Sequence, residues 1–215
     1  MDTETYNRLR MVQKKQKQEL YVSTDIEANG RVPGLSSMLS FASAVFDIDK
    51  NLLGTFSRNL NLLPGSNPHP ETDAFWNETD ANKAAYLATR VDTVDPAEAM
   101  RDYAAFLKGL PGTPVFVGYP AAFDFKWIDY YAHAFIGDNP FGFSRCIDVK
   151  SYAYAVLKKE KFSHTTKRNM PKNWFDDLPH THIALDDAIE QGAMWINLLR
   201  ETTGLPRLAN LTLAA

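Results

Sequence analysis

Cysteine is nearly absent from the sequence, because Cys146 is the only one, and this excludes a disulfide within the chain. A chain without disulfides is typical of a reducing compartment, so we expect a cytoplasmic location. No apolar run approaches the roughly 20 residues that a membrane-spanning helix needs. The polar, basic residues 8–17 lack the apolar core of a secretory signal. These absences favour a globular protein with no membrane partner.

An excess of positive charge is also missing. The 23 lysines and arginines are outnumbered by 26 acidic residues, which excludes a strongly basic nucleic-acid coat but allows an enzyme with a local basic groove. With 215 residues, of which 45% are hydrophobic, the chain can bury the core of one domain. We expect this domain over residues 20–203, after a polar tail or extra helix over 1–19 and before a C-terminal tail over 204–215.

The first third of the chain has the pattern of strands. Residues 20–26 predict the first strand. Residues 38–49 and 51–63 are rich in apolar and β-compatible side chains and flank a turn at 49–51, which predicts antiparallel neighbours. The prolines and glycine within residues 64–70 then predict a long loop that contains Phe75 and Trp76.

Helical signals dominate the remainder. Asp95 has the features of an N-cap, with Pro96 at the first helical position, so the spacing predicts a helix over 95–110. Short apolar segments predict strands over 114–119 and 143–149. Further helices are predicted over 122–135, 151–160 and 182–199. This order of elements indicates an α/β domain with a mixed sheet.

Two pairs of acids have the spacing of a divalent-metal site. Asp25 and Glu27 end a predicted strand, where residues i and i+2 point to the same face, so both carboxylates project together. Two adjacent anions repel each other, and a cation between them relieves the repulsion. Asp2 and Glu4 have the same spacing but lie in a terminal polar segment without a strand, so we predict no metal there. A solvated turn is the alternative explanation for either pair.

Two later segments add candidate residues. Asp124 follows a buried strand at the start of a helix, between two phenylalanines, where it is either a site residue or an acid that complements the helix dipole. The segment from His180 to Asp187 places histidines beside acids at the head of the last helix. A histidine there is suited to accepting a proton from water, or alternatively it caps the helix.

These motifs occur together in one order: Asp25-x-Glu27 at a strand end, "FD" at Asp124, and "HIALDDA" from His182 to Ala188. The set closely resembles the DnaQ-like (DEDDh) 3′–5′ exonuclease family over about residues 20–200. The resemblance implies an RNase H-like fold, with a mixed sheet of about five strands flanked by helices. This sequence departs from the family's common pattern at Asn29 and in "GYPAAFD", which leaves the substrate contacts open.

The resemblance also implies roles for residues. Asp25, Glu27 and Asp187 would hold one divalent ion, and Asp25 with Asp124 a second, the ions being Mg²⁺ or Mn²⁺. His182 would be the general base. His180 and Asp186 compete for two of these roles, and the family spacing selects His182 and Asp187. The implied reaction is two-metal hydrolysis from a 3′ end that releases nucleoside 5′-monophosphates.

Substrate contacts are expected outside these acids. Residues 158–172 carry six basic residues against one acid, and such a loop either follows a phosphate backbone or is simply solvated. Phe75 and Trp76 either stack on the terminal base or pack under their loop. Asp148 is not counted as a ligand. The expected substrate-binding residues are Ala28, Asn29, Gly30, Phe75, Trp76, Phe123, Lys167 and Arg168.

We therefore predict a free-standing exonuclease that acts on the 3′ end of single-stranded RNA or DNA and can form a homodimer. RNA is preferred because the "FW" loop and the second motif resemble the small exoribonucleases similar to RNase AS. One alternative is a two-metal phosphohydrolase of short oligonucleotides or dinucleotides. The other is an inactive RNase H-like module that binds nucleic acid, which would have lost at least one metal ligand.

Overall fold

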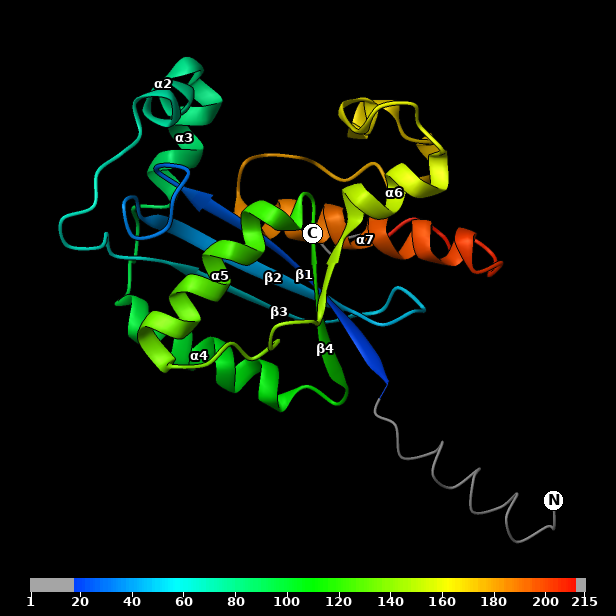
Figure 1. The fold of residues 1–215 in the computed structure, drawn as a ribbon, viewed down its shortest axis with the longest axis horizontal. Coiled ribbons are helices and arrows are strands. Elements are labelled where there is room, and N and C mark those ends of the chain that lie inside the picture. The colour runs from blue at the N-terminus through cyan, green and yellow to red at the C-terminus, as the bar shows by residue number, and fades with distance from the viewer. Residues whose placement is uncertain (1–17, 212–215) are drawn as a thin grey trace, which may run out of the picture.

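A mixed five-stranded sheet forms the centre of the molecule, with strand order β3-β2-β1-β4-β5 (Figure 1). The structure is a computed structural model that describes residues 18–211, so the expected extra helix and the Asp2/Glu4 pair lie outside the described residues. β1 pairs antiparallel with β2 and parallel with β4, while β2–β3 is antiparallel and β4–β5 parallel. The strands are β1 (Glu19–Ala28), β2 (Met38–Phe46), β3 (Leu52–Asn59), β4 (Thr113–Gly118) and β5 (Cys146–Asp148).

Helices cover both faces of this sheet (Figure 1). They are α2 (Pro70–Glu78), α3 (Asp80–Ala88), α4 (Pro96–Gly109), α5 (Ala121–Ile136), α6 (Val149–Leu157) and α7 (Ala184–Thr202), with 3₁₀ turns η1 (Phe162–His164), η2 (Lys167–Asn169) and η3 (Lys172–Trp174). α4 and α5 pack on one face, and α7 packs on the other against β1 and β2. The predicted mixed α/β sheet is confirmed.

Most predicted elements are present with shifted ends. The N-cap at Asp95 is confirmed, since its Oδ1 accepts hydrogen bonds from the N–H groups of Ala97 (2.8 Å) and Glu98 (3.3 Å). The strand predicted over 143–149 shortens to three residues. Its first part is drawn into a turn, where the Arg145 guanidinium donates to the carbonyls of Pro140 (2.7 Å) and Phe141 (2.9 Å).

The long loop predicted around Phe75 and Trp76 is wrong, because these residues lie in helix α2. Pro70 is not a loop marker but occupies the first turn of α2, where its missing N–H costs nothing. Thr79 then separates α2 from α3, and its Oγ1 accepts the N–H of Asn82 (3.0 Å) as an N-cap. The two helices close over a small apolar cluster that contains Trp76.

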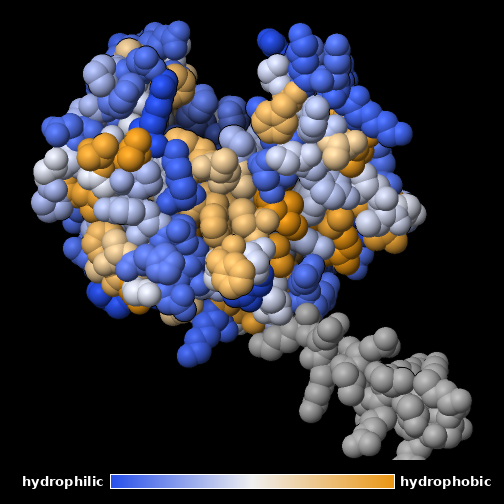
Figure 2. All heavy atoms as spheres, in the orientation of Figure 1, coloured by the Kyte–Doolittle hydropathy of each residue, from blue (hydrophilic) through white to orange (hydrophobic). Residues whose placement is uncertain are grey.

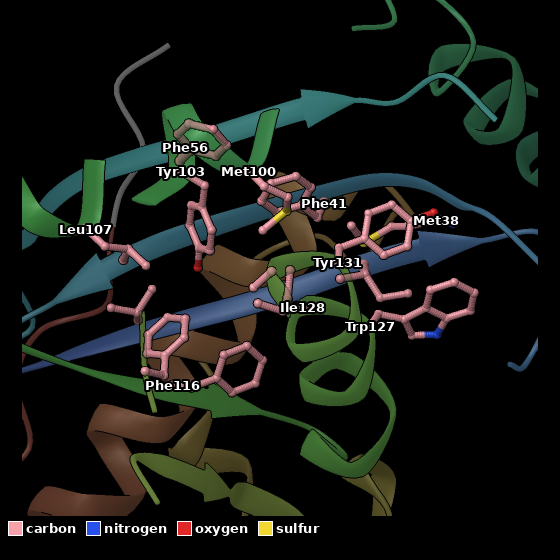
Figure 3. Packing of buried hydrophobic residues seen from close by; sticks show 14 of the residues in the cluster. Met38, Phe41, Phe56, Met100, Tyr103, Leu107, Phe116, Trp127, Ile128 and Tyr131 are labelled. Atoms are coloured by element: carbon pink, nitrogen blue, oxygen red, sulfur yellow. Dashed lines mark hydrogen bonds between the residues drawn. The ribbon is translucent and has the colours of Figure 1, made fainter. Parts of the chain in front are cut away.

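The α4/α5 side of the sheet holds an aromatic core (Figure 3). Tyr103 of α4 is fully buried there, and its ring packs edge-on against Phe41 with centroids 5.1 Å apart. Its hydroxyl meets Ser43 Oγ at 2.7 Å. Burial raises the pKa of Tyr103 to about 12. This core fixes α4 and α5 against the strands that carry the site.

Alternation along β1 decides which side chains face α7. The α4/α5 core takes Leu20, Val22, Ile26 and Ala28 from this strand. Ser23 points the other way and accepts a hydrogen bond from Gln191 Nε2 of α7 (3.0 Å). Because Asp25 and Glu27 have the same parity as Ser23, they also face α7.

α7 approaches the sheet very closely at Gly192. A Cβ atom there would lie 2.3 Å from the Phe46 ring and 3.0 Å from Ser23 Cβ, so only glycine fits. The close approach brings the head of α7 against the end of β1. Among the described helices, none has both the length and the apolar character needed to cross a membrane.

A buried ion pair secures the segment that precedes α7. Lys50 Nζ, from the β2–β3 turn, lies 2.6 Å from Asp176 Oδ2, and both side chains are almost fully shielded from solvent. Asn197 of α7 joins the pair, since its Oδ1 accepts from Lys50 (3.0 Å) and its Nδ2 donates to Asp176 (2.7 Å). The network ties the chain just before the histidine segment to the body of the protein.

Removing one charge from this network should destabilise the fold. We expect Asp176→Asn to lower the free energy of unfolding by about 3–5 kcal/mol, because it leaves the buried Lys50 ammonium without a carboxylate. Urea denaturation measures the change. The control is Asp102→Asn, which breaks an exposed pair with Arg58 (3.0 Å) and should cost less than about 1 kcal/mol. Equal costs for the two variants would contradict the prediction.

Candidate active site

Three carboxylates from two elements meet beside the end of β1. Asp25 and Glu27 of β1 and Asp187 of α7 each offer an oxygen, and these oxygens all lie within 4.8 Å of one another. Glu27 and Asp187 are buried, and Asp25 is partly exposed. The structure therefore brings together three of the four acids that were singled out as metal ligands.

Asp124 reaches the same place from the first turn of α5. Because β1 and β4 are parallel, the chain that leaves β4 emerges at the edge where Asp25 and Glu27 lie. Asp148 holds the start of α5 there, since its Oδ1 accepts the N–H of Ala121 (2.9 Å). Asp148 thus anchors helix starts, as the N-cap of α6 as well, and does not join the cluster.

Burial and mutual repulsion dominate the electrostatics of the cluster. Burial, followed by the charges of Asp124, Glu27 and Asp187, raises the pKa of Asp25 well above its usual range. Burial and the charges of Asp187 and Asp124 do the same to the pKa of Glu27. Burial raises the pKa of Asp124 to about 7. An ion bound between these groups would remove the repulsion, so the oxygen donor set fits a hard divalent cation.

Asp187 also organises the segment that precedes α7. Its Oδ1 accepts the N–H of Thr181 (2.9 Å), and its Oδ2 accepts the N–H of His182 (3.2 Å). His180 Nδ1 lies 3.1 Å from Oδ1 of the same carboxylate. Burial by itself would raise the pKa of Asp187, but the hydrogen bonds from His180 and Thr181 outweigh it and lower the pKa. The carboxylate thus stays ionised and holds the histidine segment in place.

His182 lies ahead of α7, which begins at Ala184, so the helix predicted over 182–199 starts two residues later than expected. Its backbone has φ of 58°, a left-handed conformation that costs free energy outside glycine and is often found at functional sites. The imidazole packs edge-on against Phe75 of α2 at 5.3 Å. Burial, and then the neighbouring His180, lowers the pKa of His182. The neutral ring is the form that can accept a proton.

The two competing residues have other partners. His180 is more exposed than His182 and contacts Asp187. The imidazole centroids of His180 and His182 lie 5.0 Å apart. Asp186 is turned away from the carboxylate cluster, and its Oδ2 accepts the hydroxyl hydrogen of Thr181 (2.8 Å). The geometry thus favours Asp187 over Asp186 as a ligand.

A cavity of about 350 Å³ opens beside Glu27 and His182. Its other lining residues are Ala28, Gly30, Arg31, Glu71, Thr72, Phe75, Trp76 and Phe123. In space-filling view the molecule is hollowed between the α2–α3 side and the segment that follows α6 (Figure 2). Five of the eight expected substrate residues line this cavity.

The aromatic pair divides into two roles. Phe75 is 36% exposed and presents its ring to the cavity. Trp76 is buried, and its Nε1 donates to the carbonyl oxygen of Ala28 (3.1 Å). Trp76 therefore connects α2 to the end of β1, which is the packing alternative, while Phe75 keeps an accessible face.

Asn29 and Gly30 shape the turn after β1. The Asn29 side chain is buried, with Oδ1 accepting the N–H of Ser37 (2.7 Å), so it stabilises the β1–β2 connection. Gly30 is needed for close approach, because a Cβ atom there would lie 2.0 Å from Ser36 Oγ. The backbone of Asn29 is engaged as well, since its N–H donates to the carbonyl oxygen of Ser37 (3.0 Å) and its carbonyl oxygen accepts the N–H of His69 (2.7 Å). Asn29 does not line the cavity.

The basic segment is not an unstructured loop but folds into the turns η1, η2 and η3. Arg168 is exposed. Lys167 is turned inward and forms an ion pair with Glu190 of α7. The segment therefore offers one inward-facing cation near the cluster as well as a solvated surface.

Sequence reasoning missed three residues at the site. Arg31 and Glu71 form an exposed ion pair at the cavity, and Glu71 was overlooked because α2 had been assigned to a loop. Glu190 is a buried acid three residues after Asp187. That spacing places Asp187 and Glu190 on one face of the helix, and it was the signal in the sequence that could have identified Glu190.

A second cavity, of about 430 Å³, lies away from the carboxylates. It is lined by Leu107 at the end of α4 and by Thr113 and Pro114 at the start of β4. The start of β4 pairs with the start of β1, and Asp25 and Glu27 lie at the opposite end of β1. The smaller cavity is therefore the one relevant to the carboxylates.

Comparison with solved structures identifies the fold. The chain superposes on the nuclease domain of 3′hExo, a DEDDh family member bound to rAMP, with a TM-score of 0.60 and 13% identity over 92% of this chain and 98% of that one. It also superposes on E. coli Exonuclease I in complex with a dA16 oligonucleotide, with a TM-score of 0.62 and 16% identity, covering 86% of this chain and 41% of that one. The fold is therefore the RNase H-like fold of DEDDh exonucleases.

Sequence comparison gives the family. No family model matches the chain. The Escherichia coli protein 3′–5′ DNA exonuclease Cap18 is 31% identical over 199 residues, which cover 88% of this chain and 97% of that protein. The chain belongs to the DEDDh, DnaQ-like family of 3′–5′ exonucleases and is a 3′–5′ exonuclease.

Cation binding at the cluster should be visible in thermal stability. We expect Mn²⁺ to raise the melting temperature of the EDTA-treated protein, because a ligand at about 100 times its Kd stabilises the native state by about 2.7 kcal/mol. Asp25→Asn removes one repelling charge, so this variant should melt higher than the parent in EDTA and respond little to Mn²⁺. Differential scanning fluorimetry measures both effects. Asp138→Asn, at an exposed acid after α5, is the control, and equal Mn²⁺ responses in all three proteins would contradict the prediction.

Proposed function

We propose that the protein hydrolyses phosphodiester bonds one at a time from the 3′ end of single-stranded nucleic acid, by a two-metal mechanism that releases nucleoside 5′-monophosphates. One observation carries the proposal: Asp25, Glu27 and Asp187 converge within 4.8 Å at the edge of a cavity that His182 and Phe75 also line. This arrangement places acids for cations, a base for water and a face for a nucleobase side by side.

Four acids would hold the ions. Asp25, Glu27 and Asp187 would bind one, and Asp25 with Asp124 the other, with oxygen donors that suit Mg²⁺ or Mn²⁺. When bound, the ions would supply positive charge at the phosphate and lower the pKa of the attacking water. The raised pKa values of Asp25 and Glu27 support this role, since such acids are held in place for a cation.

His182 would accept the proton of the attacking water. Its lowered pKa keeps the imidazole neutral near physiological pH, and its place on the cavity beside Glu27 gives it access to the reacting groups. Asp187 would hold the ring in position through the His182 N–H. His180 would act indirectly, through its contact with Asp187.

The terminal nucleotide would occupy the cavity, whose volume of about 350 Å³ is within the range of pockets for small ligands. Phe75 and Phe123 would contact its base, with Ala28 and Gly30 beside them. The open cleft of Figure 2 favours a strand that continues beyond this nucleotide over a dinucleotide substrate. The homodimer stays a prediction.

Single-stranded DNA is the substrate we favour. Cap18 is named as a DNA exonuclease, and it shares 31% identity with this chain over most of both lengths. Exonuclease I was solved with DNA oligonucleotides, whereas 3′hExo was solved with rAMP. The "FW" pair and the second motif instead predict RNA, so hydrolysis of matched DNA and RNA strands decides between the two substrates.

The direct test uses 5′-labelled single-stranded DNA and RNA of one sequence, each with Mg²⁺, Mn²⁺ or EDTA. We expect a ladder that shortens from the 3′ end, nucleoside 5′-monophosphates as products, no reaction in EDTA, and a higher kcat/KM for DNA. Asp25→Ala should lose at least about a thousandfold in rate, because it removes the acid shared by both ions. Asp2→Ala has the same D-x-E context and should match the parent. Undiminished degradation by Asp25→Ala would refute the mechanism.

Phe75 offers a separate test of the nucleotide cavity. Loss of a base–aromatic contact costs about 1–3 kcal/mol, so Phe75→Ala should lower kcat/KM by about tenfold, mainly through KM. Steady-state kinetics on the DNA substrate measure it. Phe143→Ala is the matched control, because that ring is 99% exposed and does not line the cavity. A similar loss in both variants would show that Phe75 does not act at the site.

A further inference from the structure

Glu190 is a buried acid beside the carboxylate cluster with no role in the proposed ion binding. Its side chain is only 10% exposed and lies on α7 three residues after Asp187. Burying a carboxylate is costly without a partner. Its partner is the ammonium of Lys167, from the turn η2 in the basic segment.

Lys167 is held in place from several directions. Tyr119, the residue directly after β4, donates from its hydroxyl to the carbonyl oxygen of Thr165 (3.0 Å) and so fixes the chain two residues before Lys167. The Lys167 ammonium lies 5.7 Å from the centroid of the Tyr119 ring. Together with the Glu190 carboxylate, these contacts fix a side chain that would otherwise be mobile.

This ammonium lies on the Asp187 side of α7, because its partner Glu190 follows Asp187 by three residues on one helix face. In agreement with this placement, its charge acts to lower the pKa of Asp25, Asp124 and Asp187. A cation at this place opposes the mutual repulsion of the acids. A lysine ammonium is also a strong point charge for a phosphate oxygen.

We propose that Glu190 is a positioning residue that holds the Lys167 ammonium at the edge of the carboxylate cluster. There Lys167 offsets part of the acids' charge before divalent ions bind, and it binds an oxygen of the phosphate that reaches the cluster. The second role rests on the proposed function and the first does not. No bond is made or broken by either residue, because Lys167 acts through its charge.

The first test measures Mn²⁺ binding by calorimetry at mildly alkaline pH without nucleic acid. A fixed positive charge near the cluster opposes a divalent ion, so Lys167→Met should bind Mn²⁺ about tenfold more tightly than the parent. Lys172→Met removes an equal charge from the exposed part of the same segment and should leave the Kd unchanged. Lys167→Gln replaces Lys167→Met if the latter does not fold. A Kd within about twofold of the parent would overturn the proposed placement.

The second test uses hydrolysis kinetics at saturating Mn²⁺. Loss of a charge-assisted contact to phosphate should lower kcat/KM for Lys167→Met by at least about tenfold. Glu190→Gln should also lower it, although Glu190 touches no substrate, and Lys167→Arg should recover part of the activity. The double variant should be no slower than Lys167→Met, because both changes remove one contact. Melting temperatures are recorded for every variant.

The outcomes separate this inference from the proposed function. If the losses in kcat/KM of the two single variants multiply in the double variant, the positioning role of Glu190 is overturned. It is also overturned if neither single variant changes the kinetics. In both cases the parent still degrades DNA. If the parent degrades no nucleic acid but Lys167→Met binds Mn²⁺ more tightly, the proposed function fails and the placement of Lys167 stands. If the parent binds no Mn²⁺, both fail.

Discussion

Mutual repulsion among Asp25, Glu27, Asp124 and Asp187 is the constraint on which the rest of the structure depends. Four acids that protein atoms shield from water raise one another's free energy, so each must be held by contacts elsewhere. β1 is a central strand, paired on both sides. α7 is locked to it by the buried Gln191 and the close approach of Gly192, and α5 by the aromatic core. Rigid elements on both faces of the sheet thus keep the carboxylates together.

Asp187 links this cluster to the histidine segment. Its two oxygens accept N–H groups from residues 181 and 182, so the geometry that orients the carboxylate also sets the backbone of His182. At the other end of the segment, Asp176 is tied to Lys50 and Asn197. The left-handed backbone of His182 is therefore held from both sides, as residues in sparsely populated conformations must be. This explains how a histidine outside the helix keeps a defined position.

The two sides of the cleft differ in chemistry. On one side, α2 presents Phe75 above a buried Trp76 that is bonded to the end of β1. On the other, the segment after α6 is basic, and Lys167 turns inward to Glu190 while other charges stay in solvent. A nucleic acid strand carries flat bases and anionic phosphates, which match an aromatic and a cationic surface respectively. The carboxylate cluster lies between them, where cations would complete the match.

The sequence by itself determined the local features. The shared face of Asp25 and Glu27 follows from strand alternation, and the start of α4 follows from Asp95 and Pro96. The order of the motifs indicated the family. The resemblance to the family's spacing, and not the helical periodicity, favoured Asp187 over Asp186. Only the tertiary structure decided what depends on distant partners. Residues 70–78 and 80–88 are helical although prolines suggested a loop, the Asn29 side chain is engaged by Ser37, and Glu190 meets Lys167. Local periodicity cannot reveal such contacts, because the two partners are not neighbours in the local pattern. Their free energy arises only when the folded sheet brings both partners together.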